Sequence, residues 1–265
     1  MTTKAYDKFS ADYDRFVNWD ERFATEMPFL LAQLETVKPA ARESARILDA
    51  ACGTGMHAIR LAQEGFATAG TDISAEMIKH ARANARAGPV GTLFKTAGFG
   101  EIRDKLHRSP LLPFDAVLCL GNSLAHLTIP GAVQSALVDM ATCLRPGGML
   151  LLQNRNFDRV MREKQRWLGT QSHTEGEHEW IFLRFYDFEP DGLITFNIIH
   201  LYRQGDQPWQ DHISSVKLLP LKRKMLTELL RSAGFTNIKS YAAMSNQPYD
   251  PNSSGNLVIT ARKAP

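Results

Sequence analysis

Short apolar runs alternate with helix-like segments between residues 46 and 152. The runs predict five strands, centred on Ile47-Leu48, Thr68-Ala69, Leu93-Phe94, Ala116-Val117-Leu118 and Met149-Leu150-Leu151. Apolar residues at helical spacing predict helices over residues 56–64, 75–86 and 131–144, and Ser74 is the expected N-cap of the second. This alternation requires right-handed crossovers, so it predicts a parallel sheet with helices on both faces.

Different patterns flank this core. Residues 1–44 predict two N-terminal cap helices, one with an aromatic face built from Tyr6, Phe9, Tyr13, Phe16 and Trp19. In residues 159–219 the alternation stops, and three apolar segments separated by turn residues predict an inserted antiparallel sheet. A helix ended by Gly234 and two late strands complete what we expect to be a single domain spanning residues 1–265.

Composition excludes several classes of protein. The 265 residues are 44% hydrophobic and 22% charged, which is typical of a globular domain. A net charge of +3 gives no reason to expect nucleic acid as a partner. No N-terminal apolar run or membrane-length segment occurs, and the three cysteines lack metal-ligand spacing. We therefore expect a cytoplasmic protein with no membrane partner and reduced core cysteines.

The most informative stretch is residues 47–55, a buried strand followed by a glycine turn and a helix. Gly53 and Gly55 allow the backbone to bend and to approach a ligand closely. Asp49, four residues before Gly53, would repel a pyrophosphate but suits a ligand with a positive charge. Asp72 ends the next strand, where a carboxylate can accept both ribose hydroxyls of an adenosine. Together these residues indicate S-adenosylmethionine, an adenosyl cofactor with a cationic tail.

One alternative uses the same turn. Residues 53–58 also fit the dinucleotide pattern G-x-G-x-x-A, and Asp72 lies where an NAD-binding acid is expected. Asp49 has no role in that interpretation, which is why the adenosylmethionine interpretation is favoured.

The turn and its two acids resemble the class I S-adenosylmethionine-dependent methyltransferases. The resemblance implies a Rossmann-like fold whose mostly parallel sheet has seven strands, with helices on both faces. It also implies cofactor contacts from Arg22 to the methionine carboxylate, from Met77 to the adenine, and from Gly98, Phe99 and Leu120 nearby. Arg22 could equally be a surface arginine, and Met77 could equally be a core residue. Gly98 stands where relatives often have an acid or amide, so only backbone groups could read the adenine there.

A second motif resembles the glycine and sarcosine N-methyltransferases. It consists of Gly-Asn-Ser-Leu-Ala-His-Leu at residues 121–127, together with Arg-Pro-Gly-Gly at residues 145–148 before the fifth strand. The resemblance implies that Arg155 pairs with the carboxylate of an amino-acid acceptor and that Asn122 also contacts substrate. A guanidinium fork suits a carboxylate because it binds both oxygens at once.

Other roles remain open for two residues of this region. Arg155 could pair with Asp158 and only fix its loop. His126 could line the substrate pocket or be a loop histidine satisfied by the backbone. No residue is assigned as catalytic, because methyl transfer from a sulfonium to an amine needs no protonation of the leaving group and no dedicated base.

The sequence thus predicts a methyltransferase that acts on a small-molecule acceptor, with an amine favoured. The inserted segment would cover the substrate pocket. Leu219 replaces a tyrosine of the resembling group, which predicts a less polar pocket and an acceptor larger than glycine. An O-methyltransferase and a non-catalytic S-adenosylmethionine binder are the alternatives, and a homo-oligomer is compatible with the sequence.

Two polar clusters have simpler explanations than ligand binding. His173, Glu175, Glu177 and Glu179 could share one strand face, but the stretch is expected to be a solvated loop without a metal. The basic residues 222–224 are expected to be an exposed helix surface rather than an RNA site.

Overall fold

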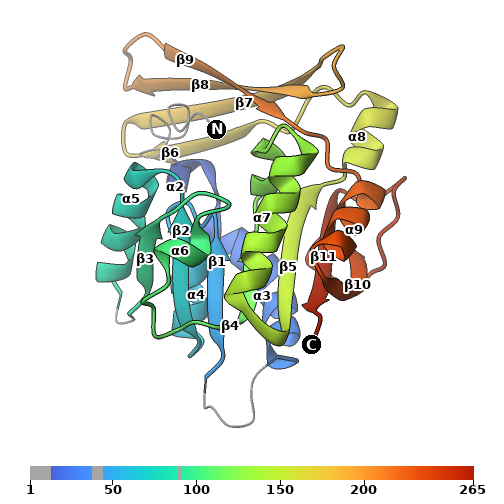
Figure 1. The fold of residues 1–265 in the computed structure, drawn as a ribbon. Coiled ribbons are helices and arrows are strands. Elements are labelled where there is room, and N and C mark those ends of the chain that lie inside the picture. Colours follow the sequence, from blue (N-terminus) through green and yellow to red (C-terminus); the bar gives the residue numbers. More distant parts are fainter. Residues whose placement is uncertain (1–12, 38–43, 89–90) are drawn as a thin grey trace.

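A seven-stranded sheet forms the centre of the computed structural model, which describes residues 13–37, 44–88 and 91–265 (Figure 1). The strand order is β10-β11-β5-β4-β1-β2-β3, in which β1 to β5 are parallel and β11 is antiparallel to both neighbours. The fold predicted from the sequence is confirmed. The strands are β1 (Arg46–Ala50), β2 (Ala67–Asp72), β3 (Leu93–Thr96), β4 (Phe114–Cys119), β5 (Leu144–Arg155), β10 (Phe235–Ala242) and β11 (Asn256–Lys263).

Helices cover both faces of this sheet because successive strand residues point in opposite directions. Leu48 belongs to the core beneath α6, α7 and α9, whereas Ile47 belongs to the core beneath α3 and α4. A smaller cluster joins α4 and α5 around Phe94. Strands of this kind are apolar on both faces, as the sequence pattern indicated. The helices are α3 (Trp19–Glu35), α4 (Met56–Gln63), α5 (Ala75–Arg86), α6 (Ile102–Lys105), α7 (Pro130–Cys143) and α9 (Arg223–Ser232).

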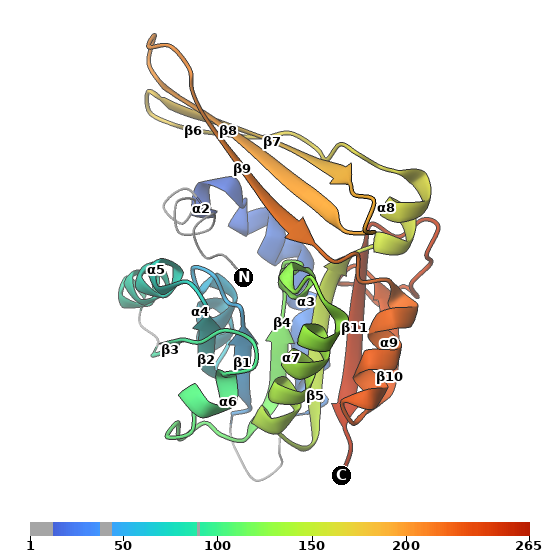
Figure 2. The same ribbon diagram turned by 45° about the horizontal axis from the view of Figure 1, so that its top comes forward.

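A second, four-stranded antiparallel sheet lies across the carboxyl ends of the parallel strands (Figure 2). Its order is β6-β7-β8-β9, and the turns predicted at residues 190–192 and 204–206 join β7 to β8 and β8 to β9. The strands are β6 (Gln171–Glu175), β7 (His178–Phe188), β8 (Ile194–Gln204) and β9 (Gln210–Leu218).

One expectation for this sheet is wrong. The stretch from His173 to Glu179 is not a solvated loop but a β-hairpin, in which Thr174 pairs with Glu179. Its polar composition is compatible with a strand because β6 is the edge of the sheet, where charged side chains are common. The β-propensity of these polar residues does not predict a strand, because β6 forms only by pairing with β7.

Within the described residues the N-terminal part forms α2 (Tyr13–Phe16) and α3, while Tyr6 and Phe9 lie outside the described residues. Asp14 of α2 accepts hydrogen bonds from Thr54 in the glycine turn (2.6 Å) and from Asn84 in α5 (3.1 Å). These contacts hold α2 against the carboxyl end of the sheet.

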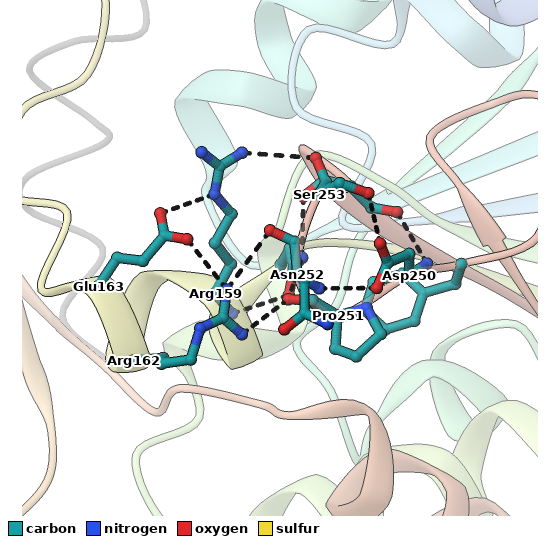
Figure 3. Close-up of polar contacts among 10 residues, drawn as sticks. Arg159, Arg162, Glu163, Asp250, Pro251, Asn252 and Ser253 are labelled. Carbon is teal, nitrogen blue, oxygen red and sulfur yellow. Dashed lines mark hydrogen bonds and ion pairs between the residues drawn. The ribbon is translucent and has the colours of Figure 1, made fainter.

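A helix that the sequence analysis did not predict, α8 (Phe157–Glu163), follows β5 and precedes the second sheet. Asn156 caps it by accepting from the Arg159 backbone N–H (3.0 Å). Arg159 and Arg162 then donate to backbone carbonyls of the 250–254 turn, and both pair with Glu163 (Figure 3). The end of β5 is thereby fixed against the loop between β10 and β11.

Candidate functional site

A pocket opens at the carboxyl ends of the parallel strands, between the glycine turn, α2 and the second sheet. Eight of the twelve predicted site residues line it: Gly53, Asp72, Met77, Gly98, Phe99, Asn122, His126 and Arg155. Arg22, Asp49, Gly55 and Leu120 do not line it, and each has a different position described below. The pocket therefore joins the predicted cofactor and acceptor residues in one cavity.

The two glycines of the turn serve different purposes. Gly53 lines the pocket with a φ of +55°, which favours glycine. Gly55 also has a positive φ, +79°, but a Cβ there would lie 2.6 Å from the Phe94 ring. Gly55 thus allows tight packing under the turn, and Gly53 allows close approach to a ligand.

Asp72 stands at the edge of the pocket with its carboxylate fixed. One oxygen accepts from the Gly53 N–H and the other from the Ser74 N–H, each at 2.9 Å. Ser74 in turn caps α5 by accepting from the Met77 N–H (3.1 Å), as predicted. Carboxylate oxygens can accept further hydrogen bonds, so Asp72 presents oriented acceptors to the cavity.

Asp49 lies beneath the turn and is only 2% exposed. Burial raises the pKa of its carboxyl to about 7, and the nearby negative charge of Asp72 adds to the increase. The charge of Arg22 acts in the opposite direction. A carboxyl in this position gains most from a ligand that brings a positive charge next to it.

Arg22 is a half-buried residue of α3 rather than a surface arginine. Its guanidinium donates to Glu26 (3.1 Å) and Gln153 (3.4 Å) and lies over the Trp19 ring. Burial alone would raise the pKa of Glu26, but a hydrogen bond from His57 and the Arg22 charge lower it to about 2. Gln153 also accepts from the Gly121 N–H, so this network reaches the edge of the pocket.

On the opposite side of the turn, Met77 is almost fully buried while lining the pocket. Gly98 and Phe99 follow β3 and line it too. Their loop is held by Asp139 of α7, which accepts from the backbone N–H groups of residues 100, 102 and 103 at 2.8–3.1 Å. Sequence analysis missed Asp139, because only the tertiary packing of α7 brings it to this loop.

Leu120, which was predicted to contact the cofactor, is not among the residues that line the pocket. Its side chain is buried in the core beneath α3, and its carbonyl accepts from the Ser123 hydroxyl (2.8 Å) at the start of η1 (Ser123–His126). The side chain therefore supports the pocket from below.

Asn122, one of the predicted acceptor residues, lines another part of the pocket and has a φ of +70°. Its side-chain oxygen accepts from the Arg155 backbone N–H (3.1 Å), which fixes the orientation of the amide. His126 lines the cavity nearby, and burial lowers its pKa to about 4. His126 is therefore neutral at neutral pH.

Arg155 reaches the pocket without pairing with Asp158. Asp158 accepts instead from the Arg223 N–H (3.0 Å) and the Tyr249 hydroxyl (2.8 Å). The Arg155 side chain is hydrogen-bonded to Tyr186, whose own pKa burial raises. The alternative in which Arg155 only fixes its loop through Asp158 is wrong for this structure.

The pocket is also lined by residues of α2 and of the second sheet that were not assigned to the site from the sequence. Tyr13 and Phe16 line the pocket from α2, and Arg184 and Tyr186 line it from β7. Tyr202 of β8 bonds His178 (2.8 Å) and lines a separate groove. The period-two pattern of β7, which places residues 184 and 186 on one face, is the signal that could have found them.

Within the described residues, no group of three or more histidine, cysteine, aspartate or glutamate side chains could hold a metal ion. No described helix has the length and apolar character needed to cross a membrane. Cys52, Cys119 and Cys143 are free thiols, the last two of them buried.

Comparison with known proteins agrees with this geometry. A family model described as a methyltransferase domain matches residues 47–148. The glycine/sarcosine N-methyltransferase of Parasynechococcus marenigrum is 34% identical over 88% of this chain and 76% of its own length. The glycine/sarcosine N-methyltransferase of Aphanothece halophytica is 29% identical over 88% of this chain and 80% of its own length. An S-adenosylmethionine-dependent methyltransferase structure from Clostridium acetobutylicum superposes with a TM-score of 0.77 at 17% identity, covering 98% of this chain and all of the other.

The fold and the pocket are those of a class I S-adenosylmethionine-dependent methyltransferase. Within that class, the chain belongs to the family that includes the glycine/sarcosine N-methyltransferases. Its cofactor is therefore S-adenosylmethionine, which excludes the dinucleotide-binding alternative. The residues present suit this cofactor, because an oriented Asp72 carboxylate flanks a cradle of positive-φ glycines above the buried Asp49.

Proposed function

We propose that this methyltransferase transfers a methyl group to the nitrogen of a small amine that carries a carboxylate. The observation that carries the proposal is Arg155, whose guanidinium shares the pocket with Gly53 and Asp72 and has Tyr186 as its hydrogen-bond partner. Relatives in the same family are named for N-methylation of glycine and sarcosine, which supports an amine acceptor of this kind.

The proposed cofactor contacts divide along the pocket. Asp72 would accept the ribose hydroxyls, and the Gly53 turn would lie against the cofactor. Asp49 and Arg22 would meet its ammonium and carboxylate, while Met77, Gly98 and Phe99 would enclose the adenine. Gly55 and Leu120 would act only by supporting this surface from beneath. When bound, S-adenosylmethionine supplies an electrophilic methyl group on a sulfonium.

This chain's own residues then orient the acceptor. Arg155 would hold its carboxylate through a two-pronged contact, and Asn122, fixed by the Arg155 N–H, would direct the amine. His126, neutral because it is buried, would form part of the wall without a charge that repels the amine or the sulfonium. Positioning and exclusion of water are the main tasks, since the leaving group needs no acid.

Residues 159–219 are proposed as the cover of this pocket and residues 1–44 as its N-terminal cap. Leu168, Phe196 and Ile198 of the first segment line the cavity, and so does Phe16 of the second. The three free thiols support a reducing, cytoplasmic location. A free small molecule, rather than nucleic acid, is the proposed acceptor, because it must fit beneath this cover.

The test compares wild type with Arg155→Lys on amines that differ only in a carboxylate. The lysine keeps the charge but loses the fork, so KM for carboxylate-bearing amines should rise about 10- to 100-fold. The affinity for S-adenosylhomocysteine, measured by calorimetry, should not change. Arg166→Lys, at an exposed ion pair with Asp187, is the matched control. An equal loss on both kinds of amine would show that Arg155 is structural. Methylation of alcohols alone would contradict the proposed amine.

A further inference from the structure

The acceptor side of the pocket holds two arginines rather than one. Arg184 lies on the same face of β7 as Tyr186 and lines the cavity with Arg155. Burial lowers the pKa of Arg184 to about 10, and the positive charge of Arg155 contributes to the decrease. Arg155 and Arg184 thus bring two positive charges to the lining of the same cavity.

Arg184 has only part of its hydrogen-bonding capacity satisfied. One terminal nitrogen donates to the Gly169 carbonyl (3.0 Å), and the guanidinium lies over the Phe16 ring, 4.9 Å from its centroid. Its Nε is buried and has no hydrogen-bond partner. A buried N–H of a charged group that lacks a partner is costly, so a ligand acceptor at this point would be favourable.

No carboxylate among the described residues pairs with either arginine. Asp158 accepts hydrogen bonds from the Arg223 backbone N–H and the Tyr249 hydroxyl. Asp187, three residues beyond Arg184, lies on the other face of β7 and binds Arg166 and Asn197, each at 2.8 Å. In the described part of the chain, the two positive charges of the pocket are therefore left for a ligand to neutralise.

Apolar side chains of the second sheet line the cavity beside Arg184. Arg184 is paired in register with Ile198, and Tyr186 with Phe196, and all four residues line the cavity. This part of the second sheet thus offers apolar surface next to Arg184 for a short hydrocarbon segment. The two arginines beside the apolar side chains of Phe196 and Ile198 suit an acceptor with a short hydrocarbon segment and a charged group at its end.

We infer that the acceptor of this enzyme is a dianionic amine, with Arg155 and Arg184 together binding its two negative charges. This inference rests on the proposed N-methylation of a carboxylate-bearing amine and specifies its substrate class. The two charges could belong to two carboxylates, as in an aminodicarboxylic acid, or to one phosphonate on a short amine. Arg184 is accordingly a specificity-determining residue for the reaction.

The first test uses the wild-type enzyme with matched amines. Glycine and alanine supply one negative charge, aspartate and glutamate supply two carboxylates, and aminomethylphosphonate supplies both charges on one group. We expect kcat/KM for at least one dianionic amine to exceed that for glycine by 10-fold or more. Preference for aspartate or glutamate would identify two carboxylates, and preference for aminomethylphosphonate would identify the single group. Equal or better use of glycine would overturn the inference while leaving N-methylation intact.

The second test uses Arg184→Gln, with Arg203→Gln as the control. Arg203 belongs to the same sheet but lies on its opposite face, where it binds Glu179 at 2.9 Å. Arg184→Gln should reduce kcat/KM for the preferred dianionic amine by about 10- to 100-fold and that for glycine by less than about threefold. Arg203→Gln should change neither. A uniform loss on all amines would show that Arg184 only packs against Phe16, which overturns the inference.

Thermal-shift measurements of ligand binding test the inference without depending on turnover. With the enzyme saturated by S-adenosylhomocysteine, dianionic amines should raise the melting temperature of wild type and of Arg184→Lys more than that of Arg184→Gln. Glycine should shift all three alike. Absence of any difference between dianionic amines and glycine on the wild-type protein would overturn the assignment, whatever the activity.

Discussion

At the scale of single residues, the buried carboxyl of Asp49 links the stability of the fold to the charges next to it. It is 2% exposed, and the charge of Asp72 nearby disfavours its ionised form. Its pKa of about 7, against an ordinary value of 3.8, means that the folded protein holds this proton more tightly than the unfolded chain. A cationic ligand reverses that balance, because it favours the charged carboxylate. In the proposed cofactor site, Asp49 would cost stability in the free protein and contribute affinity for the cofactor.

The substitution Asp49→Asn should separate these two effects. The variant should bind S-adenosylhomocysteine about 10- to 100-fold more weakly by calorimetry, since one charge-assisted hydrogen bond is lost. Without ligand it should melt at a higher temperature than wild type at pH 8. Asp115→Asn, at a buried carboxyl bound to Arg145, is the control: it should destabilise the protein and leave affinity unchanged. A variant with unchanged affinity would remove Asp49 from the cofactor site.

The same residue predicts the direction of a pH dependence. Between about pH 4 and pH 7 the folded state carries a proton at Asp49 that the unfolded chain has lost, so this contribution to stability falls as pH rises. The stability difference between Asp49→Asn and wild type should therefore grow from pH 4 to pH 7 and be small below pH 4. Thermal melts of both proteins over this range provide the measurement, and a constant difference would contradict the raised pKa.

At the scale of secondary-structure elements, the short helix α2 depends on contacts outside itself. Four residues are too few to form a stable helix alone. Asp14 supplies the missing stabilisation, since it accepts from the Thr54 hydroxyl, the Asn84 amide and the Trp19 ring N–H. Because Thr54 belongs to the glycine turn, the position of α2 is coupled to the cofactor site.

Asp14→Ala should release α2 while leaving the central sheet folded. We expect the affinity for S-adenosylhomocysteine to fall by about 10-fold, because Tyr13 and Phe16 would no longer close the pocket. The melting temperature should change by only a few degrees. Asp20→Ala, at an exposed acid in the first turn of α3, serves as the control and should change neither quantity. Full affinity in the Asp14 variant would mean that α2 is not part of the cofactor site.

At the scale of the whole molecule, the predictable part of the structure is the part built from local patterns. The five parallel strands, the cap at Ser74 and the glycine turn depend on residues close in sequence, and each was predicted within a few positions. Asp72 was predictable for the same reason, because it ends a strand that neighbours β1. Parallel strands that end at one edge gather their last residues automatically.

The remainder depends on contacts between distant segments. Arg184 lines the pocket only because β7 pairs with β8 and the second sheet crosses the carboxyl ends of the seven-stranded sheet (Figure 2). Asp139 holds the loop after β3 although it lies almost forty residues farther along the chain, and only tertiary packing brings the two together. The edge strand β6 forms by pairing and not by propensity. Local periodicity carries no information about such contacts.

These long-range contacts join α2 and the second sheet into one cover. Phe16 packs edge-on against Phe182 with ring centroids 5.2 Å apart, and Arg184 lies over Phe16. Arg15 lies over Trp180 and pairs with Glu175 (3.0 Å). Since Asp14 also ties α2 to the glycine turn, ordering of the cofactor site should be transmitted to the sheet above it.

Hydrogen exchange measured with and without S-adenosylhomocysteine tests this coupling. Bound ligand should slow exchange in the glycine turn, in residues 13–16 and in the pocket end of β7 and β8, but not at the distant turn 204–210. In Phe16→Ala the protection should persist at the glycine turn and disappear from β7, because the ring that links α2 to Phe182 is gone. Protection of β7 that survives this substitution would show that the second sheet senses the ligand directly. Protection confined to the glycine turn in wild type would show that the cover is not coupled to the cofactor at all.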